Sequence, residues 1–395
     1  MLYTYPDYYK EFQCIADKCE DTCCAGWQIV VDEESLQRYK QETSDYKETL
    51  HASIDWKEQV FRQDKEKRCA FLREDNLCEM YINLGEESLC KTCTNYPRHI
   101  EEFEDEREIS LSISCPEVAR MLIAKKEPVK FWTVEKDGTD EFEDFDPFLY
   151  SMLQDARTCL FEIIQNRKLP MENRMVLSLG LAWDLENRVQ AGQLFECENV
   201  IETYRKQTYF AAAGKKADNL RRSVRGRYTF SRKMFENLRQ FELLKKDWEY
   251  VLNETEILLF SYGTDSYRKI HSEFYQWIRE HEDAYEKAMA AGLHLEKLDD
   301  WSWDIFSEQL MVYFVFTYFC GAVYDGKVLE NVQMAVACIS LIWDLLAVRW
   351  VKNEKHLDAE DIREIVYRFS RELEHSDENK NIFWKCLEAQ KELFR

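Results

Sequence analysis

The amino-acid sequence predicts a mainly α-helical protein. A small α+β, cysteine-rich, metal-binding domain (residues 1–130) is expected first, then an acidic linker (131–147) and an all-α helical domain (148–395). Two observations support this division: nine of the fourteen cysteines lie within the first 115 residues, and apolar residues recur with helical spacing beyond residue 147. The second region shows no strand–helix–strand alternation, which excludes a parallel α/β fold there.

The N-terminal region mixes short strands, turns and helices. Residues 27–31 have the pattern of a strand, and Asp32 is placed to cap a helix that continues to about Tyr46. Apolar residues alternate over 109–113 as in a strand, and Pro116 suits the first turn of a helix to about Lys125. This alternation predicts the α+β character of the domain.

The C-terminal region reads as helices separated by short breaks. Gly192 and Gly292 are placed as helix stops. The apolar stretches 310–323 and 334–342 are shorter than the roughly 20 residues that a spanning helix needs, so we expect buried core helices and no membrane span. The expected helices are 148–166, 171–191, 196–210, 232–258, 265–290, 303–324, 328–349, 358–374 and 379–394.

Composition limits the classes of function. The formal net charge is −22, from 53 basic and 75 acidic side chains, which opposes a general nucleic-acid-binding role because phosphates attract positive surfaces. The N-terminus MLYTYPDYYKEF lacks the basic and apolar regions of a secretory signal, so we expect a cytoplasmic protein. In reducing cytoplasm, fourteen cysteines are not expected to form a disulfide set.

The N-terminal cysteines have the spacing of metal ligands. Thiolates hold zinc and iron–sulfur clusters, and such ligands often come in close pairs because one turn can direct two sulfurs at one metal. The segment 69–78 reads as a hairpin with its turn at 74–76, which would bring its end cysteines together. The candidate ligands are Cys14, Cys19, Cys23, Cys24, Cys69, Cys78, Cys90, Cys93 and Cys115, of which Cys14 and Cys115 are the weaker members.

The spacing of these cysteines and the histidines near them indicate the type of metal site. No pair has the spacing of a Cys₂His₂ zinc finger, and the nearby His99 has no second histidine beside it. An all-sulfur site is therefore expected, with an iron–sulfur cluster or zinc as the two candidates. The other five cysteines lie in apolar helical contexts, where cysteine packs as a small hydrophobic residue.

At these motifs the sequence resembles the CxxCxxCC family of zinc- or iron-chelating proteins and, within it, the flagellin lysine N-methylases. The resemblance covers residues 3–125, although the first two gaps between cysteines are four and three residues here. The matching motifs are Phe12-Gln13-Cys14, Cys19-Glu20-Asp21-Thr22-Cys23-Cys24-Ala25-Gly26-Trp27, Cys69-Ala70-Phe71-Leu72, Leu77-Cys78, Leu84-Gly85-Glu86-Glu87-Ser88-Leu89-Cys90, Cys93-Thr94-Asn95-Tyr96-Pro97-Arg98 and Ser114-Cys115-Pro116.

The resemblance implies a protein-lysine N-methyltransferase. It implies S-adenosylmethionine as donor, flagellin as protein substrate and a 4Fe–4S cluster as cofactor, with zinc as the alternative metal. The sequence contains neither a G-x-G-type loop after a strand nor a C-x3-C-x2-C motif, so it predicts neither an ordinary Rossmann methyltransferase nor an ordinary radical enzyme. The alternatives are a non-catalytic zinc- or iron-binding module with a helical interaction scaffold, and a purely structural cluster.

Two further features are candidates for function. Tyr96, beside the last cysteine pair, could act as a base for the lysine amine, although a tyrosine before a proline commonly packs in a core. A basic run within this acidic chain could bind an acidic partner or an anionic cofactor, or could be a solvated loop. Its predicted partner-binding residues are Lys215, Lys216, Arg221, Arg222, Arg225 and Arg227.

Overall fold

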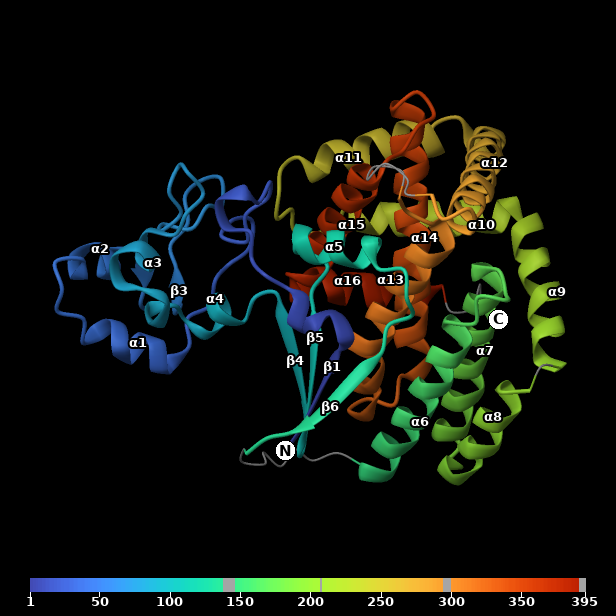
Figure 1. The fold of residues 1–395 in the computed structure, drawn as a ribbon, viewed down its shortest axis with the longest axis horizontal. Coiled ribbons are helices and arrows are strands. Elements are labelled where there is room, and N and C mark those ends of the chain that lie inside the picture. The colour runs from blue at the N-terminus through green and yellow to red at the C-terminus, as the bar shows by residue number, and fades with distance from the viewer. Residues whose placement is uncertain (138–145, 207, 294–299, 391–395) are drawn as a thin grey trace.

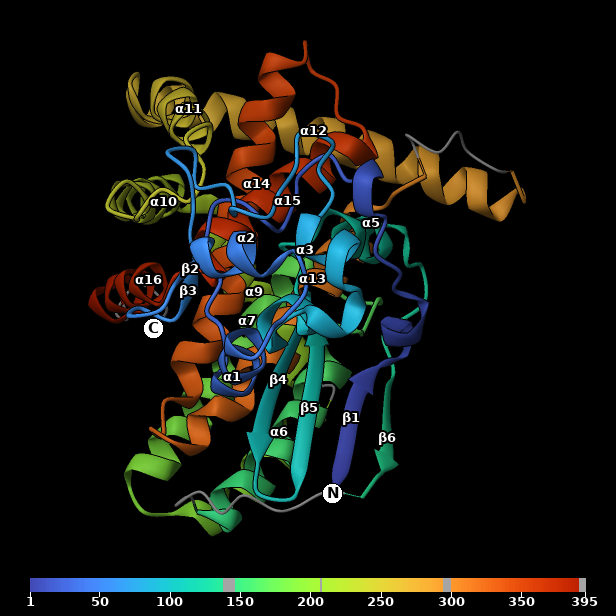
Figure 2. The same cartoon turned by 90° about the vertical axis from the view of Figure 1, so that its left-hand side faces the viewer.

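The computed structural model describes residues 1–137, 146–206, 208–293 and 300–390, apart from the side chains of residues 209 and 220–222. A cysteine-rich lobe, residues 13–95, projects from a larger body that contains the other described residues (Figure 1). A four-stranded sheet lies on the side of the body nearest the lobe, and helices fill the rest (Figures 1 and 2). The predicted mainly helical architecture is confirmed.

The sheet has the strand order β4-β5-β1-β6. Strand β1 runs parallel to β5 and antiparallel to β6, so that Thr4 pairs with both Glu108 and Thr133. The strand predicted around 109–113 is confirmed as β5, but it begins at Glu106 because β4 and β5 form a hairpin. The strands are β1 (Leu2–Pro6), β4 (Arg98–Phe103), β5 (Glu106–Leu111) and β6 (Phe131–Glu135).

Helices cover one face of this sheet. The ring of Phe131 on β6 lies 4.3 Å from that of Phe316, and Arg157 forms a buried ion pair with Glu108 of β5. The body's helices are α5 (Pro116–Ala124), α6 (Pro147–Ile164), α7 (Met171–Gln190), α8 (Cys197–Tyr204), α9 (Thr208–Arg222), α10 (Val224–Leu238), α11 (Trp248–Thr255), α12 (Gly263–Ala290), α13 (Trp303–Tyr318), α14 (Val328–Lys352), α15 (Ala359–Glu374) and α16 (Asp377–Ala389).

Most predicted helices are confirmed, but two predictions were wrong. The helix expected over 196–210 ends at Tyr204, and a separate helix α9 begins at Thr208. The helix expected over 232–258 is two helices, because residues 239–247 leave the helical path and run beside the lobe. The basic run is therefore helical, on α9 and α10, and is not a loop.

Two segments have the length and apolarity of a membrane span, Trp303–Val323 and Val328–Lys352. Both are longer than the apolar stretches that the sequence suggested. In each, 83% of the apolar window is buried inside the described structure, as expected for core helices. They form the centre of the body (Figure 1).

The lobe is built from short elements around a small core. Asp32 caps α1 as predicted, by accepting a 3.0 Å hydrogen bond from Ser35 N, but the helix ends at Lys40. Residues 27–31 form one isolated bridge, Val30 to Val60, and no full strand. The elements are α1 (Glu33–Lys40), α2 (Lys47–Ala52), β2 (Ile54–Asp55), β3 (Val60–Phe61), α3 (Glu79–Leu84) and α4 (Lys91–Asn95).

The hydrophobic cores divide the chain differently from the predicted boundary at residue 130. The lobe core contains residues from Ile29 to Cys90, whereas Tyr8, Phe103 and Leu111 belong to the large core of the body. Of the predicted linker, residues 131–135 are strand β6, residues 138–145 lie outside the described residues, and Asp146 caps α6. The sheet thus belongs to the helical body, because its apolar face is covered by α6 and α13.

Candidate functional site

The structure brings five of the nine predicted thiols together in the lobe. Cys24 lies beside Cys69, whose backbone N donates a 2.8 Å hydrogen bond to the Cys24 carbonyl. Cys78 follows the predicted turn. An isolated β-bridge between Leu72 and Cys78 closes this turn, and Asn76 within it adopts the left-handed conformation, with φ 60°. The last pair, Cys90 and Cys93, lies at the start of α4.

These thiols lie close enough to affect one another's pKa. A hydrogen bond with Cys23 lowers the pKa of Cys24 to about 7, and a hydrogen bond with Cys93 lowers the pKa of Cys90. Burial raises the pKa of Cys69 to about 12, and the neighbouring Cys24, Cys78 and Cys90 raise it further. Each close pair thus stabilises one thiolate, the form that binds metal.

The chemistry of the set suits both candidate metals. Thiolates are the ligands of structural zinc and of iron–sulfur clusters, so the donor set fits either group. In the described part of the chain, no three His, Cys, Asp or Glu side chains are close enough to hold one ion.

The other four predicted thiols form a second set where the lobe meets the body. Burial raises the pKa of Cys115 to about 11, and Cys19 and Cys14 act in the same direction. A hydrogen bond with Cys24 raises the pKa of Cys23, and Cys14, whose thiol is exposed, raises it further. This set lies near Arg371 of α15, which forms a 2.7 Å ion pair with Asp21 of the lobe.

Tyr96 lies between lobe and body. Its ring packs against Trp27 and His375, with centroids 5.8 and 5.6 Å away, and its hydroxyl lies 3.2 Å from Ser114 Oγ. Burial raises the pKa of Tyr96 well above its usual value. The residue lines a cavity of about 220 Å³ at this junction, and it is engaged in packing and hydrogen bonding there.

A second, larger cavity lies in the body, and it was not predicted from the sequence. It has a volume of about 770 Å³, within the range of small-molecule sites. Its lining residues come from α7, the α9–α10 region, α12, α13 and α14, and none comes from the lobe among the residues that the structure describes. Five of the α12 residues that line it recur every three or four positions, which is a signal that could have indicated one shared face: Tyr267, His271, Tyr275, Ile278 and Glu282.

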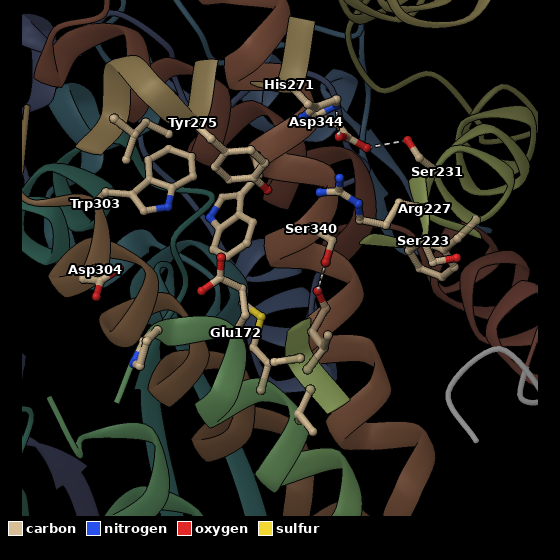
Figure 3. Close-up of a pocket in the computed structure, with 18 of the residues that line it drawn as sticks. Glu172, Ser223, Arg227, Ser231, His271, Tyr275, Trp303, Asp304, Ser340 and Asp344 are labelled. Carbon is tan, nitrogen blue, oxygen red and sulfur yellow. Dashed lines mark hydrogen bonds and ion pairs between the residues drawn. The ribbon is translucent and has the colours of Figure 1, made fainter. Parts of the chain in front are cut away.

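Polar groups of one wall form a buried network. Asp344 of α14 accepts a hydrogen bond from Ser231 of α10, and its Oδ1 lies 3.0 Å from His271 Nε2 and 3.4 Å from the Tyr267 hydroxyl. Figure 3 shows His271, Asp344, Ser231 and Arg227 together on one side of the cavity. Within the described structure, neither ring nitrogen of His271 makes a well-aligned hydrogen bond.

The other end of the cavity is acidic. Glu282 accepts a 2.8 Å hydrogen bond from Ser302 Oγ and another from Trp303 N, yet burial raises its pKa to about 7. Burial also raises the pKa of Asp304, and Glu172 and Glu286 contribute in the same direction. Asp304 and Trp303 lie across the cavity from Arg227 (Figure 3).

The predicted basic residues contribute to this cavity only in part. Lys216 and Arg227 line it, whereas the side chains of Lys215 and Arg225 are exposed elsewhere on α9 and α10. The side chains of Arg221 and Arg222 lie outside the described residues. The positive charge of the run indicated a segment that contributes to the cavity. The position of each residue around its helix decided which side chains reach the cavity.

Comparison with known proteins identifies the family. A family model described as the FliB lysine N-methylase C-terminal domain matches residues 157–395, more than half of the chain. The chain belongs to the FliB lysine N-methylase family. The matched region contains every residue that lines the large cavity. No solved structure matches the chain.

Curated relatives agree with this family. The lysine-N-methylases of Salmonella typhimurium and Salmonella choleraesuis are each 30% identical to it over 129 residues, which is 30% of this chain and 32% of either relative. The flagellar biosynthetic protein FliU of Salmonella muenchen is 29% identical over 129 residues, 76% of its length. The match therefore spans about a third of the length of the two lysine-N-methylases.

Proposed function

We propose that this protein is a cytoplasmic protein-lysine N-methyltransferase that moves a methyl group from S-adenosylmethionine to lysine ε-amines of flagellin. The observation that carries the proposal is the match of the lysine N-methylase family over 157–395, the region that contains the 770 Å³ cavity. The names of the relatives, lysine-N-methylase and flagellar biosynthetic protein, support the reaction and a flagellar substrate.

We further propose that the lobe carries a 4Fe–4S cluster. Four of Cys24, Cys69, Cys78, Cys90 and Cys93 would hold it, since these thiols lie near one another in the lobe and thiolates are the ligands of such clusters. When bound, the cluster would join separate segments of the lobe through its iron–thiolate bonds and so contribute folding free energy. The residues of the large cavity carry the methyl transfer, and no described residue of the lobe is among those that line it.

The test combines metal analysis with an activity assay. Protein is produced with iron in the absence of oxygen, its iron and sulfide are measured, and it is incubated with flagellin and methyl-labelled S-adenosylmethionine. We expect iron in the protein and label in methyllysine, located by mass spectrometry of flagellin peptides. Protein that contains metal but transfers no label would instead indicate a non-catalytic metal-binding module, and colourless protein with zinc alone would remove the cluster.

A further inference from the structure

The large cavity carries opposite charges in different parts. The guanidinium of Arg227 points from α10 toward its middle, and the carboxyl group of Asp304 lies at the other end (Figure 3). Glu282 belongs to that end as well, because it accepts a hydrogen bond from Trp303 N. His271 and Glu282 are eleven residues apart on α12, which corresponds to a rise of about 16 Å. The cavity therefore has room for two polar groups that are bound at separate places.

We propose that this cavity binds S-adenosylmethionine with its amino-acid head between Arg227 and Asp344, and that the acceptor lysine enters past Glu282. The proposal rests on the proposed function, because it locates the donor and acceptor of that reaction.

Polar groups without partners mark the donor half of the cavity. The Nε of Arg227 and the Nδ1 of His271 are buried, and neither has a hydrogen-bond partner in the described part of the chain. His271 is 3% exposed, so water does not readily replace the missing partners. A buried polar group without a partner is destabilising, and a polar ligand that supplied the partner would remove that cost.

The charges in this half fit an amino-acid head. Arg227 and Asp344 both lie near Tyr267: burial mainly raises the pKa of Tyr267, Asp344 raises it further, and Arg227 lowers it. A carboxylate paired with a guanidinium and an ammonium paired with a carboxylate are both charge-assisted interactions. The zwitterionic head of S-adenosylmethionine presents these two groups on one carbon.

Aromatic side chains also line the cavity. Tyr275, Phe230 and Trp343 line the cavity, as does Trp303 near the acidic end. Aromatic faces stack on a purine base and attract a cationic centre such as the sulfonium. The adenosine and the sulfonium of the donor are therefore placed against this wall.

The acidic end suits a lysine side chain. Among the described residues, Glu172, Glu282, Glu286 and Asp304 line this end together with the exposed Arg279, and the nearby Arg174 is paired with Glu308. The local field therefore favours an ammonium group. The raised pKa of Glu282, about 7, also makes its carboxylate a proton acceptor near neutral pH. An amine must lose its proton before it can act as a nucleophile.

In the transfer step, the lone pair of the neutral lysine nitrogen forms the new N–CH₃ bond. The S–CH₃ bond breaks at the same time, and its electron pair remains on sulfur, which yields neutral S-adenosylhomocysteine. The proton released from the lysine ammonium passes to the Glu282 carboxylate and then to solvent. Charge and atoms balance without an oxidant or reductant.

Calorimetric titration of the whole protein with S-adenosylmethionine tests the donor half. Arg227→Met should weaken binding at least about tenfold, because the carboxylate loses its charge-assisted partner. Arg225→Met is the matched control, since Arg225 lies two residues away on the same helix, is exposed and does not line the cavity. Wild-type affinity in a folded Arg227→Met protein, or no donor binding by the wild type, would overturn the assignment.

Two further measurements keep the test independent of folding defects. In hydrogen–deuterium exchange of the unmodified protein, the donor should protect peptides of α10 and α12, and protection confined to the lobe would contradict the proposal. Glu282→Gln should keep donor affinity within about twofold and raise the KM for a lysine peptide; an unchanged KM would remove the acceptor assignment.

The proposed function and the cavity assignment can fail separately. If the wild type binds the donor in an Arg227-dependent manner but methylates no protein, the cavity is a donor site and the proposed function is wrong. If Arg227→Met methylates flagellin as efficiently as the wild type, the function stands and the cavity is not the donor site.

Discussion

The lobe and the body differ in what stabilises their folded structures. The body buries long helices such as α13 and α14 around a large apolar core, and its buried charges are paired, as Arg174 is with Glu308. The lobe has helices of at most eight residues, two-residue strands and a small core that includes Cys69 and Cys90. A short chain with so little apolar burial usually needs cross-links or metal, so the comparison predicts that coordination stabilises the lobe but not the body.

The largest expected effect is the loss of lobe structure when a ligand is removed. Cys69→Ala or Cys90→Ala should sharply lower metal content and expose lobe peptides to hydrogen exchange, while the body remains protected. Cys338→Ala, fully buried in α14, is the control: it should keep the metal and cost only a packing defect. Equal loss of metal from all three variants would show that the lobe and body do not differ in this way.

The second expected effect concerns the body alone. Glu308→Ala leaves the buried Arg174 without its 3.0 Å ion-pair partner, and both side chains are at most 1% exposed. We expect a loss of about 3–5 kcal/mol in the free energy of unfolding, with unchanged metal content. Replacing both residues together, by Glu308→Leu and Arg174→Met, should cost much less, because no buried charge is then left alone.

The third prediction concerns pH and the junction between the two regions. Burial lowers the pKa of His375 to about 3, and Arg371, Lys380 and His99 act in the same direction. The unfolded side chain titrates near 6.5, so the contribution of neutral His375 is complete above that pH and is lost as the pH falls toward 3. At pH 5 the loss is about 2 kcal/mol, at roughly 1.4 kcal/mol per unit.

Denaturant unfolding at pH 7 and pH 5 measures this loss. His375→Gln does not titrate and should show a smaller difference between the two pH values than the wild type. In the wild type, His375 Nε2 forms a 2.6 Å hydrogen bond with Ser114 Oγ at the junction of lobe and body, so the substitution also tests this contact. The same pH dependence in both proteins would exclude His375 as the cause.

The smallest expected effect is at the exposed edge of the junction. Lys67 of the lobe forms a 2.8 Å ion pair with Glu242, but both side chains are more than a third exposed. Lys67→Ala should therefore change the free energy of unfolding by less than about 1 kcal/mol, and the change should diminish in high salt. A larger, salt-independent loss would mean that the hydrogen bond from Lys67 to the Leu243 carbonyl matters more than the ion pair.

Local sequence signals identified much of the fold. Helical spacing located α12 to α15 closely, Asp32 was identified as a cap, and the turn before Cys78 was placed correctly. These features depend on interactions between residues a few positions apart, which the sequence displays directly. The cysteine pattern likewise pointed to the lobe, since ligand residues of one type at close spacing are a local signal.

The domain boundary and the cavity were decided by tertiary structure. Strand β6 lies in a segment that looked like an acidic linker, because its partner β1 is more than a hundred residues away in the sequence. Arg227 and Asp344 meet Glu282 around one cavity through the packing of three helices that are distant along the chain. The sequence determined which chemistry was available and which segments were helical, whereas long-range packing decided which side chains share a site, because contacts between remote segments leave no periodic pattern in either one.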